Sequence, residues 1–158
     1  AWSVIRRRLC SSDEFFHILS AQAMNRESFK DFNIHTEVNA ASILEFVGQI
    51  QGVSTGFPFD ESTMVIKVGA DTKHKIFALF NIDHFEWVNL KCDPEKSIDL
   101  RGRYDGVKPG WHMNKTHWNS VSPDPISDVP AKLFWELLLH SYALVKQSLP
   151  IKIKSQLS

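Results

Sequence analysis

The side chains best suited to chemistry gather in one short stretch, residues 108–118. It offers two lysine cations, two histidines that titrate near neutral pH, an asparagine that both donates and accepts, and two tryptophan rings. Lysine and asparagine hold phosphate oxygens, and tryptophan stacks on unpaired bases. The pattern favours nucleic-acid binding, with two arginines upstream extending the basic surface. The residues expected to contact nucleic acid are Arg101, Arg103, Lys108, His112, Asn114, Lys115 and His117.

The same stretch also has a purely structural interpretation. Trp118 alternates with the polar residues His117 and Asn119, which is typical of a strand residue that faces a core. Asn114 lies a few residues after a Pro-Gly pair, where it can close a turn. The sequence alone leaves both interpretations open.

Metal binding and catalysis find less support in the spacing of the reactive residues. His112 and His117 are five positions apart, and neither His-x-x-x-His nor Cys-x-x-Cys occurs, so no zinc motif is present. Cys92 stands just before an expected helix start, where helix amides can lower the pKa of a thiol. His140 and Ser141 are adjacent, so on a helix they point in different directions. We therefore expect no catalytic residue, no metal and no cofactor, and a protein that is not an enzyme.

Composition bounds the class of protein. The 158 residues suffice for one domain with a core, and 43% hydrophobic with 23% charged residues is ordinary for a globular chain. The formal net charge is +0, so attraction for nucleic acid must come from a local cluster. Cys10 and Cys92 do not make a disulfide scaffold, and no apolar run resembles a signal peptide or a membrane span. These features predict a soluble, cytoplasmic protein with no membrane association.

Hydrophobic periodicity predicts a helix followed by a set of short strands. The helix covers residues 39–50 and carries an apolar stripe, with Asn39 or Ser42 as its cap. The links between the strands are hairpin-length, which requires antiparallel pairing. The expected strands cover residues 56–59, 64–68, 75–80 and 87–91.

The second half of the chain predicts a helix, a strand and a longer helix. Asp93, Pro94 and Glu95 together favour a helix start. A strand follows over residues 117–121, and the longest helix lies between Pro130 and Pro150. The order is α-β(3-4)-α-β(1-2)-α, which describes a two-layer α+β domain with helices on one face of an antiparallel sheet.

The expected folded domain covers residues 37–150. Residues 1–36 form an N-terminal extension that is either an appended helix or arm, or partly sequence upstream of a native start at Met24, in which case residues 1–23 are not native. Its apolar residues have helical spacing: Phe15, Phe16, Leu19 and Ala23. The Lys-rich residues 151–158 are expected to be a frayed tail.

Several segments together resemble the MmcQ/YjbR family. They are residues 89–96, residues 103–110, the run His112-Met113-Asn114-Lys115 with His117-Trp118, and Ser141-Tyr142-Ala143-Leu144-Val145 with Leu149-Pro150. The resemblance covers roughly residues 39–150. It implies a compact domain of the order given above. Because members of that family are described as DNA-binding proteins with a double-wing fold, it also implies DNA binding.

Three functional hypotheses follow. The first is a DNA-binding domain that uses the basic His/Asn/Lys loop. The second is a protein-interaction module that uses the partly open sheet face, or that self-associates through the N-terminal extension. The third is a small-ligand binder with a pocket near His112 and Cys92.

Overall fold

The computed structural model describes residues 32–157 of the chain. In chain order the elements in this part are α3 (Ala40–Val47), β1 (Val53–Gly56), β2 (Thr63–Ala70), β3 (Lys73–Asn81), β4 (Val88–Lys91), α4 (Pro94–Arg103), β5 (Val107–Pro109), β6 (Trp118–Val121), α5 (Ala131–Gln147) and α6 (Ile151–Gln156). The helical spacing expected in the N-terminal extension, together with Cys10 and Met24, lies outside the described residues.

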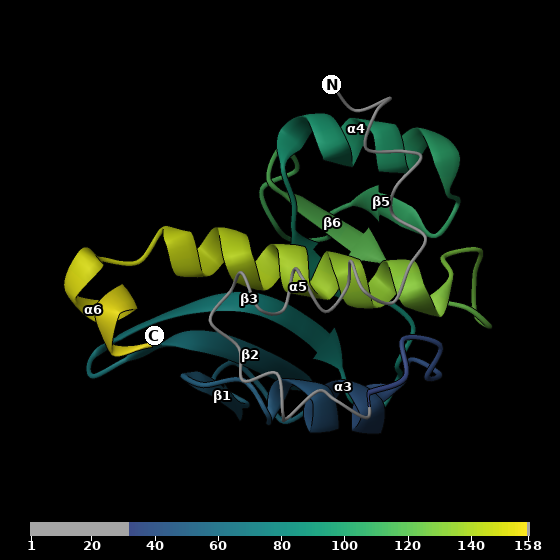
Figure 1. Ribbon diagram of the computed structural model, residues 1–158. Coiled ribbons are helices and arrows are strands. Elements are labelled where there is room, and N and C mark those ends of the chain that lie inside the picture. The colour runs from purple at the N-terminus through teal and green to yellow at the C-terminus, as the bar shows by residue number, and fades with distance from the viewer. Residues whose placement is uncertain (1–31, 158) are drawn as a thin grey trace.

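The strands form one antiparallel sheet in the order β1-β2-β3-β4-β6-β5. Helix α5 runs across the sheet and packs on β2, β3 and β4, while α4 packs on β5 (Figure 1). Helix α3 joins the helical layer through Phe46, whose ring centroid lies 5.0 Å from that of Trp135 on α5. The two-layer α+β fold with helices on one face of the sheet is therefore confirmed.

The register of the strands separates the sheet into two faces. One row of paired residues lies beneath the helices and is buried throughout: Phe80, Val88, Val121 and Val107. Side chains alternate along each strand, so the adjacent row points away from the helices. That second row runs across β3, β4, β6 and β5: Leu79, Asn89, Ser120 and Lys108. The sheet thus has a covered face and an open face.

The helix starts follow from local hydrogen bonding. Asn39 and Ser42, the two candidate caps of α3, act together: each side chain accepts the backbone amide of the other at 2.9 Å. The carboxylate of Asp93 accepts the Lys96 amide at 3.1 Å, and Pro94 fills the first position of α4. The predicted start of α4 is confirmed.

Two predicted local features are wrong. Residues 56–59 were expected to be a strand, but β1 ends at Gly56, and Phe57 and Phe59 are exposed in the connection that follows. Residues 151–158 were expected to be frayed, yet residues 151–156 form α6. The physical reason is burial, because Ile153 and Leu157 are 5% and 3% exposed in the hydrophobic core.

Candidate functional site: a groove on the open sheet face

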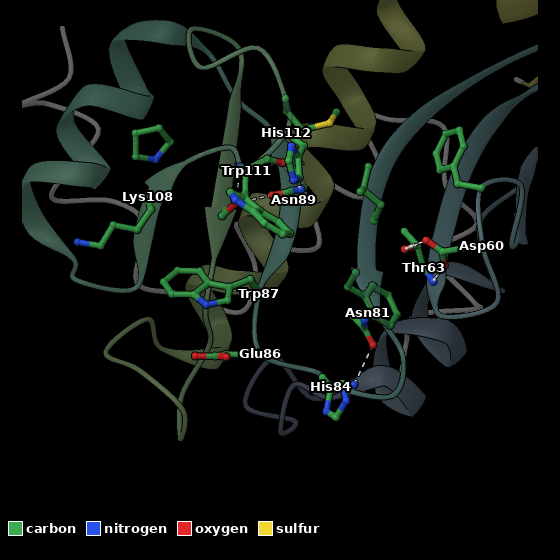
Figure 2. A pocket seen from close by; sticks show the side chains of 16 residues that line it. Asp60, Thr63, Asn81, His84, Glu86, Trp87, Asn89, Lys108, Trp111 and His112 are labelled. Atoms are coloured by element: carbon green, nitrogen blue, oxygen red, sulfur yellow. Dashed lines mark hydrogen bonds between the residues drawn. The ribbon is translucent and has the colours of Figure 1, made fainter.

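A groove of about 850 Å³ lies on the open face of the sheet. One wall is the connection between β5 and β6, which contributes Trp111 and His112. Trp87, just before β4, lies on the same side as Trp111, and the opposite side comes from the β1–β2 connection and the start of β2, with Asp60 and Thr63 (Figure 2). Phe59, next to Asp60 in the chain, also lines the groove. Three exposed aromatic side chains thus line one concave surface, and such an exposed apolar surface marks an interaction site.

The floor of the groove is the outward row of the sheet. Leu79, Asn89, Ser120 and Lys108 all line it, and they come from four neighbouring strands. Trp87 lies two positions before Asn89, so it projects from the same face as that row. The antiparallel register therefore brings together residues that lie far apart in the chain.

A closed set of hydrogen bonds fastens Trp111 above this floor. The Trp111 amide donates to Ser120 Oγ at 3.0 Å, and Asn89 Nδ2 donates to the Trp111 carbonyl at 3.2 Å. The Ser120 hydroxyl in turn donates to Asn89 Oδ1. Both backbone groups of Trp111 are thereby satisfied, so its ring is directed by the sheet and not by a free loop.

His112 has a backbone φ of 56°, in the left-handed region that non-glycine residues rarely occupy. Its ring centroid lies 4.1 Å from that of Trp111. Both rings are exposed, and that of Trp111 is 72% exposed. A strained residue beside an exposed tryptophan persists only where its surroundings fix it, and this combination is found most often at functional sites.

The charged groups of the groove fall into two kinds. Within residues 32–157, the Lys108 ammonium and the Glu86 carboxylate make no hydrogen bond or ion pair. Asp60, in contrast, accepts the amides of Thr63 and Ser62 at 2.6 and 2.8 Å and the Thr63 hydroxyl at 2.9 Å. These bonds, led by that of the Thr63 amide, lower the pKa of Asp60 below its ordinary value, so it stays ionised.

Two of the predicted nucleic-acid contacts are engaged within the protein. Arg101 Nε donates to Asn119 Oδ1 at 2.8 Å, and its Nη2 donates to the carbonyls of Trp118 and Lys115. The Lys115 ammonium donates to the carbonyl of Gly110. These two cations close the β5–β6 connection, and neither lines the groove.

The remaining predicted contacts divide between the groove and the surrounding surface. Lys108 and His112 line the groove. Arg103 forms an exposed ion pair with Asp99 at 3.1 Å. Asn114 Oδ1 accepts the amides of two following residues at 2.9 and 3.3 Å, which makes it a turn residue, and His117 is exposed outside the groove. The seven residues therefore do not form one binding surface.

Cys92 does not belong to the groove. Its side chain is buried, and burial raises the pKa of the thiol, while Ser97 and Lys96 oppose the rise less strongly. The expectation that the start of α4 lowers this pKa is wrong, because removing the thiolate from water outweighs the helix amides. His112 lines the groove and Cys92 does not, so the groove is not a pocket that these two residues share.

Sequence reasoning missed half of the groove. Phe59 was assigned to a strand, and Trp87 and Asn89 to a strand with no site role. One signal was available: in the alternating run from Trp87 to Leu90, Trp87 shares a face with Asn89 and not with the apolar Val88. A tryptophan on the polar face of a strand points toward solvent or a ligand.

Within residues 32–157, no three His, Cys, Asp or Glu side chains gather as metal ligands would. No helix in that part is long and apolar enough to cross a membrane.

Solved structures share this fold. The chain resembles the Deinococcus radiodurans protein DR2400, described as a DUF419 domain, with a TM-score of 0.70 and 34% identity over 75% of this chain and 87% of that one. It also resembles a Pseudomonas syringae protein with a TM-score of 0.56 and 23% identity over 68% of this chain and 99% of that one. The second likeness shows the fold alone.

Sequence comparisons identify the relatives. The chain is 37% identical to Uncharacterized protein YbdF of Escherichia coli O157:H7 over 59% of its length and 72% of that protein. It is 35% identical to Uncharacterized protein YjbR of Escherichia coli K12 over 40% of its length and 52% of that protein. The YjbR family model matches residues 49–144, which is more than half of the chain. This protein therefore belongs to the YjbR family.

Proposed function

We propose that this protein is a binding domain whose open-face groove holds a small ligand with a flat aromatic ring. The observation that carries the proposal is the position of Trp87 and Trp111. Their side chains lie on the same side of the groove, over neighbouring parts of the sheet, and both line it (Figure 2). Stacking a flat ring on an aromatic side chain contributes about 1–3 kcal/mol.

The size and lining of the groove support a small ligand. Pockets for small molecules usually measure about 300–1,000 Å³ and combine apolar walls with a few polar groups. The groove of about 850 Å³ lies in that range. In it, aromatic and aliphatic side chains lie near the polar groups of Lys108, Glu86 and His112, which make no side-chain hydrogen bond within residues 32–157.

DNA binding through the basic loop stays a prediction. Arg101 and Lys115 hold their own loop, and Arg103 pairs with Asp99. The groove itself carries the carboxylates Asp60 and Glu86, which repel a phosphate backbone. These contacts favour a small ligand over a duplex.

A thermal-shift screen with flat aromatic compounds tests the proposal, because a ligand of the native state raises its apparent stability. We expect compounds that raise the melting temperature of the wild type. Trp111→Ala should abolish that rise, and Trp111→Phe, which keeps a ring, should retain most of it. Ile98→Ala is the matched control, since Ile98 is 71% exposed on α4 outside the groove. The proposal fails if no compound acts, or if active compounds act equally on Trp111→Ala.

A further inference from the structure

The polar groups of the groove are ordered along the sheet. Lys108 lies on β5, the edge strand, and Glu86 lies in the β3–β4 connection, two residues before β4 begins. Asp60 lies beyond them, in the connection between β1 and β2 at the other edge. A cation therefore stands at one end of the groove, and carboxylates stand toward its middle and far end.

The strand order sets the separation of these charges. Strands β5 and β4 are two places apart in the sheet, with β6 between them. Neighbouring strands are about 4.8 Å apart, so β5 and β4 are roughly 10 Å apart. Lys108 is in register with Asn89, three residues beyond Glu86, so the backbones of Lys108 and Glu86 are separated by roughly 14 Å in all. In the view of Figure 2, Trp87 lies between Lys108 and Glu86, and Trp111 lies to one side of Trp87. An occupant that satisfies all four residues has an anion at one end, a flat ring, and a hydrogen-bond donor at the other end.

We infer, on the basis of the proposed function, that this ligand is a nucleoside monophosphate whose base carries an amino group. The phosphate lies at Lys108, because an ammonium is a strong point-charge partner for phosphate. The base stacks on the tryptophans, and its exocyclic amino group donates to the Glu86 carboxylate.

Other aromatic ligands satisfy fewer of these groups. An aromatic amino acid carries its ammonium and carboxylate on one carbon, so it cannot reach both Lys108 and Glu86. A simple aromatic acid has no donor for Glu86. A nucleic-acid strand offers the same nucleotide chemistry, but its neighbouring phosphates would pass the carboxylates of Glu86 and Asp60. The charges therefore favour a free nucleotide.

The test is calorimetric titration at low salt with adenosine monophosphate (AMP), adenosine and inosine monophosphate (IMP). Adenosine lacks the phosphate, and IMP lacks the amino group. Since each removes one charge-assisted hydrogen bond, both should bind about tenfold more weakly than AMP. Equal affinities for all three ligands would overturn the inference.

Two variants assign these losses to residues. Lys108→Ala should weaken AMP about tenfold and leave adenosine unchanged, whereas Glu86→Gln should weaken AMP and leave IMP unchanged. Lys73→Ala is the matched control, because Lys73 is exposed in the β2–β3 hairpin outside the groove. If Lys108→Ala weakens AMP and adenosine alike, the phosphate position is wrong.

The outcomes separate this inference from the proposed function. If no nucleotide binds but other flat compounds stabilise the protein through Trp111, the inference fails and the proposed function stands. If no flat compound binds, both fail. A short deoxyadenosine oligonucleotide is the last arm of the experiment. If the oligonucleotide binds more tightly than AMP and its affinity falls steeply with salt, the site binds a nucleic-acid strand, and the inference of a free nucleotide is overturned.

Discussion

His140 on α5 makes the stability of this fold sensitive to acid. Its Nε2 accepts the backbone amide of Asp93 at 3.1 Å, at the residue that caps α4. An acceptor nitrogen carries no proton, so this bond requires the neutral ring. Burial, and to a lesser degree the positive charge of Lys96, lower the pKa of His140 to about 4, while Asp93 opposes the shift. Protonation therefore removes the bond and places a cation in a partly buried site.

The magnitude follows from the two states of the ring. In the unfolded chain the pKa of a histidine is about 6.5, so the unfolded state takes up the proton first as the pH falls. The contribution of His140 is fully present above that pH and is lost as the pH falls toward about 4. Between about pH 7 and about pH 4.5 the loss amounts to about 2.5 kcal/mol in the free energy of unfolding.

The assay is urea unfolding of the wild type and of His140→Gln at these two pH values. The glutamine Oε1 can take the place of Nε2 as acceptor, and it does not titrate. The wild type should lose about 2.5 kcal/mol more than the variant on acidification, because all other titrating groups are common to both. His117→Gln, at an exposed ring, should behave like the wild type. Equal losses in the wild type and His140→Gln would refute the assignment.

Further predictions concern buried and backbone positions. Ser141 is fully buried, and its Oγ donates to the Phe77 carbonyl and accepts the Lys91 amide at 2.8 Å. Ser141→Ala should therefore lower the free energy of unfolding by about 2 kcal/mol, and a loss below about 0.5 kcal/mol would contradict this. An added methyl at Gly102 meets nothing within 4 Å inside α4, so Gly102→Ala should stabilise by about 0.5–1 kcal/mol and raise the melting temperature. At Gly52, φ is 78°, and an added methyl would lie 2.2 Å from the Leu157 side chain. Gly52→Ala should therefore lower the melting temperature, and an unchanged melting temperature would contradict the expected strain.

Local signals in the sequence predict much of this fold. Hairpin-length links require antiparallel pairing whatever the rest of the chain does, and Asp93 with Pro94 starts a helix through bonds within one turn. Features that depend on distant contacts were not predicted. Residues 151–156 become a helix because Ile153 finds the core, and no local pattern in a Lys-rich tail indicates that burial.

The candidate site also combines residues that the sequence predicted with residues that it did not. The chemistry-rich stretch was correctly placed beside the last strand, and two of the contacts predicted in it, Lys108 and His112, line the groove. Residue type cannot tell a cation that faces solvent from one that bonds a nearby carbonyl, and Arg101 and Lys115 are of the second kind. Two further aromatic side chains come from Phe59 and Trp87, whose proximity to the loop depends on the strand order of the whole sheet.

The loop after β5 has both a structural and a functional role, because the hydrogen bonds that close it also hold Trp111 exposed. Leaving 72% of the Trp111 side chain in water and holding His112 at φ 56° both cost free energy, about 1–2 kcal/mol for the second. The bonds from Asn89, Ser120 and the loop cations offset that cost, and none of them covers the exposed ring. These bonds hold the Trp111 ring outward, on the same side of the groove as a second exposed tryptophan, Trp87. That placement is the strongest physical reason to regard the loop as part of a binding site.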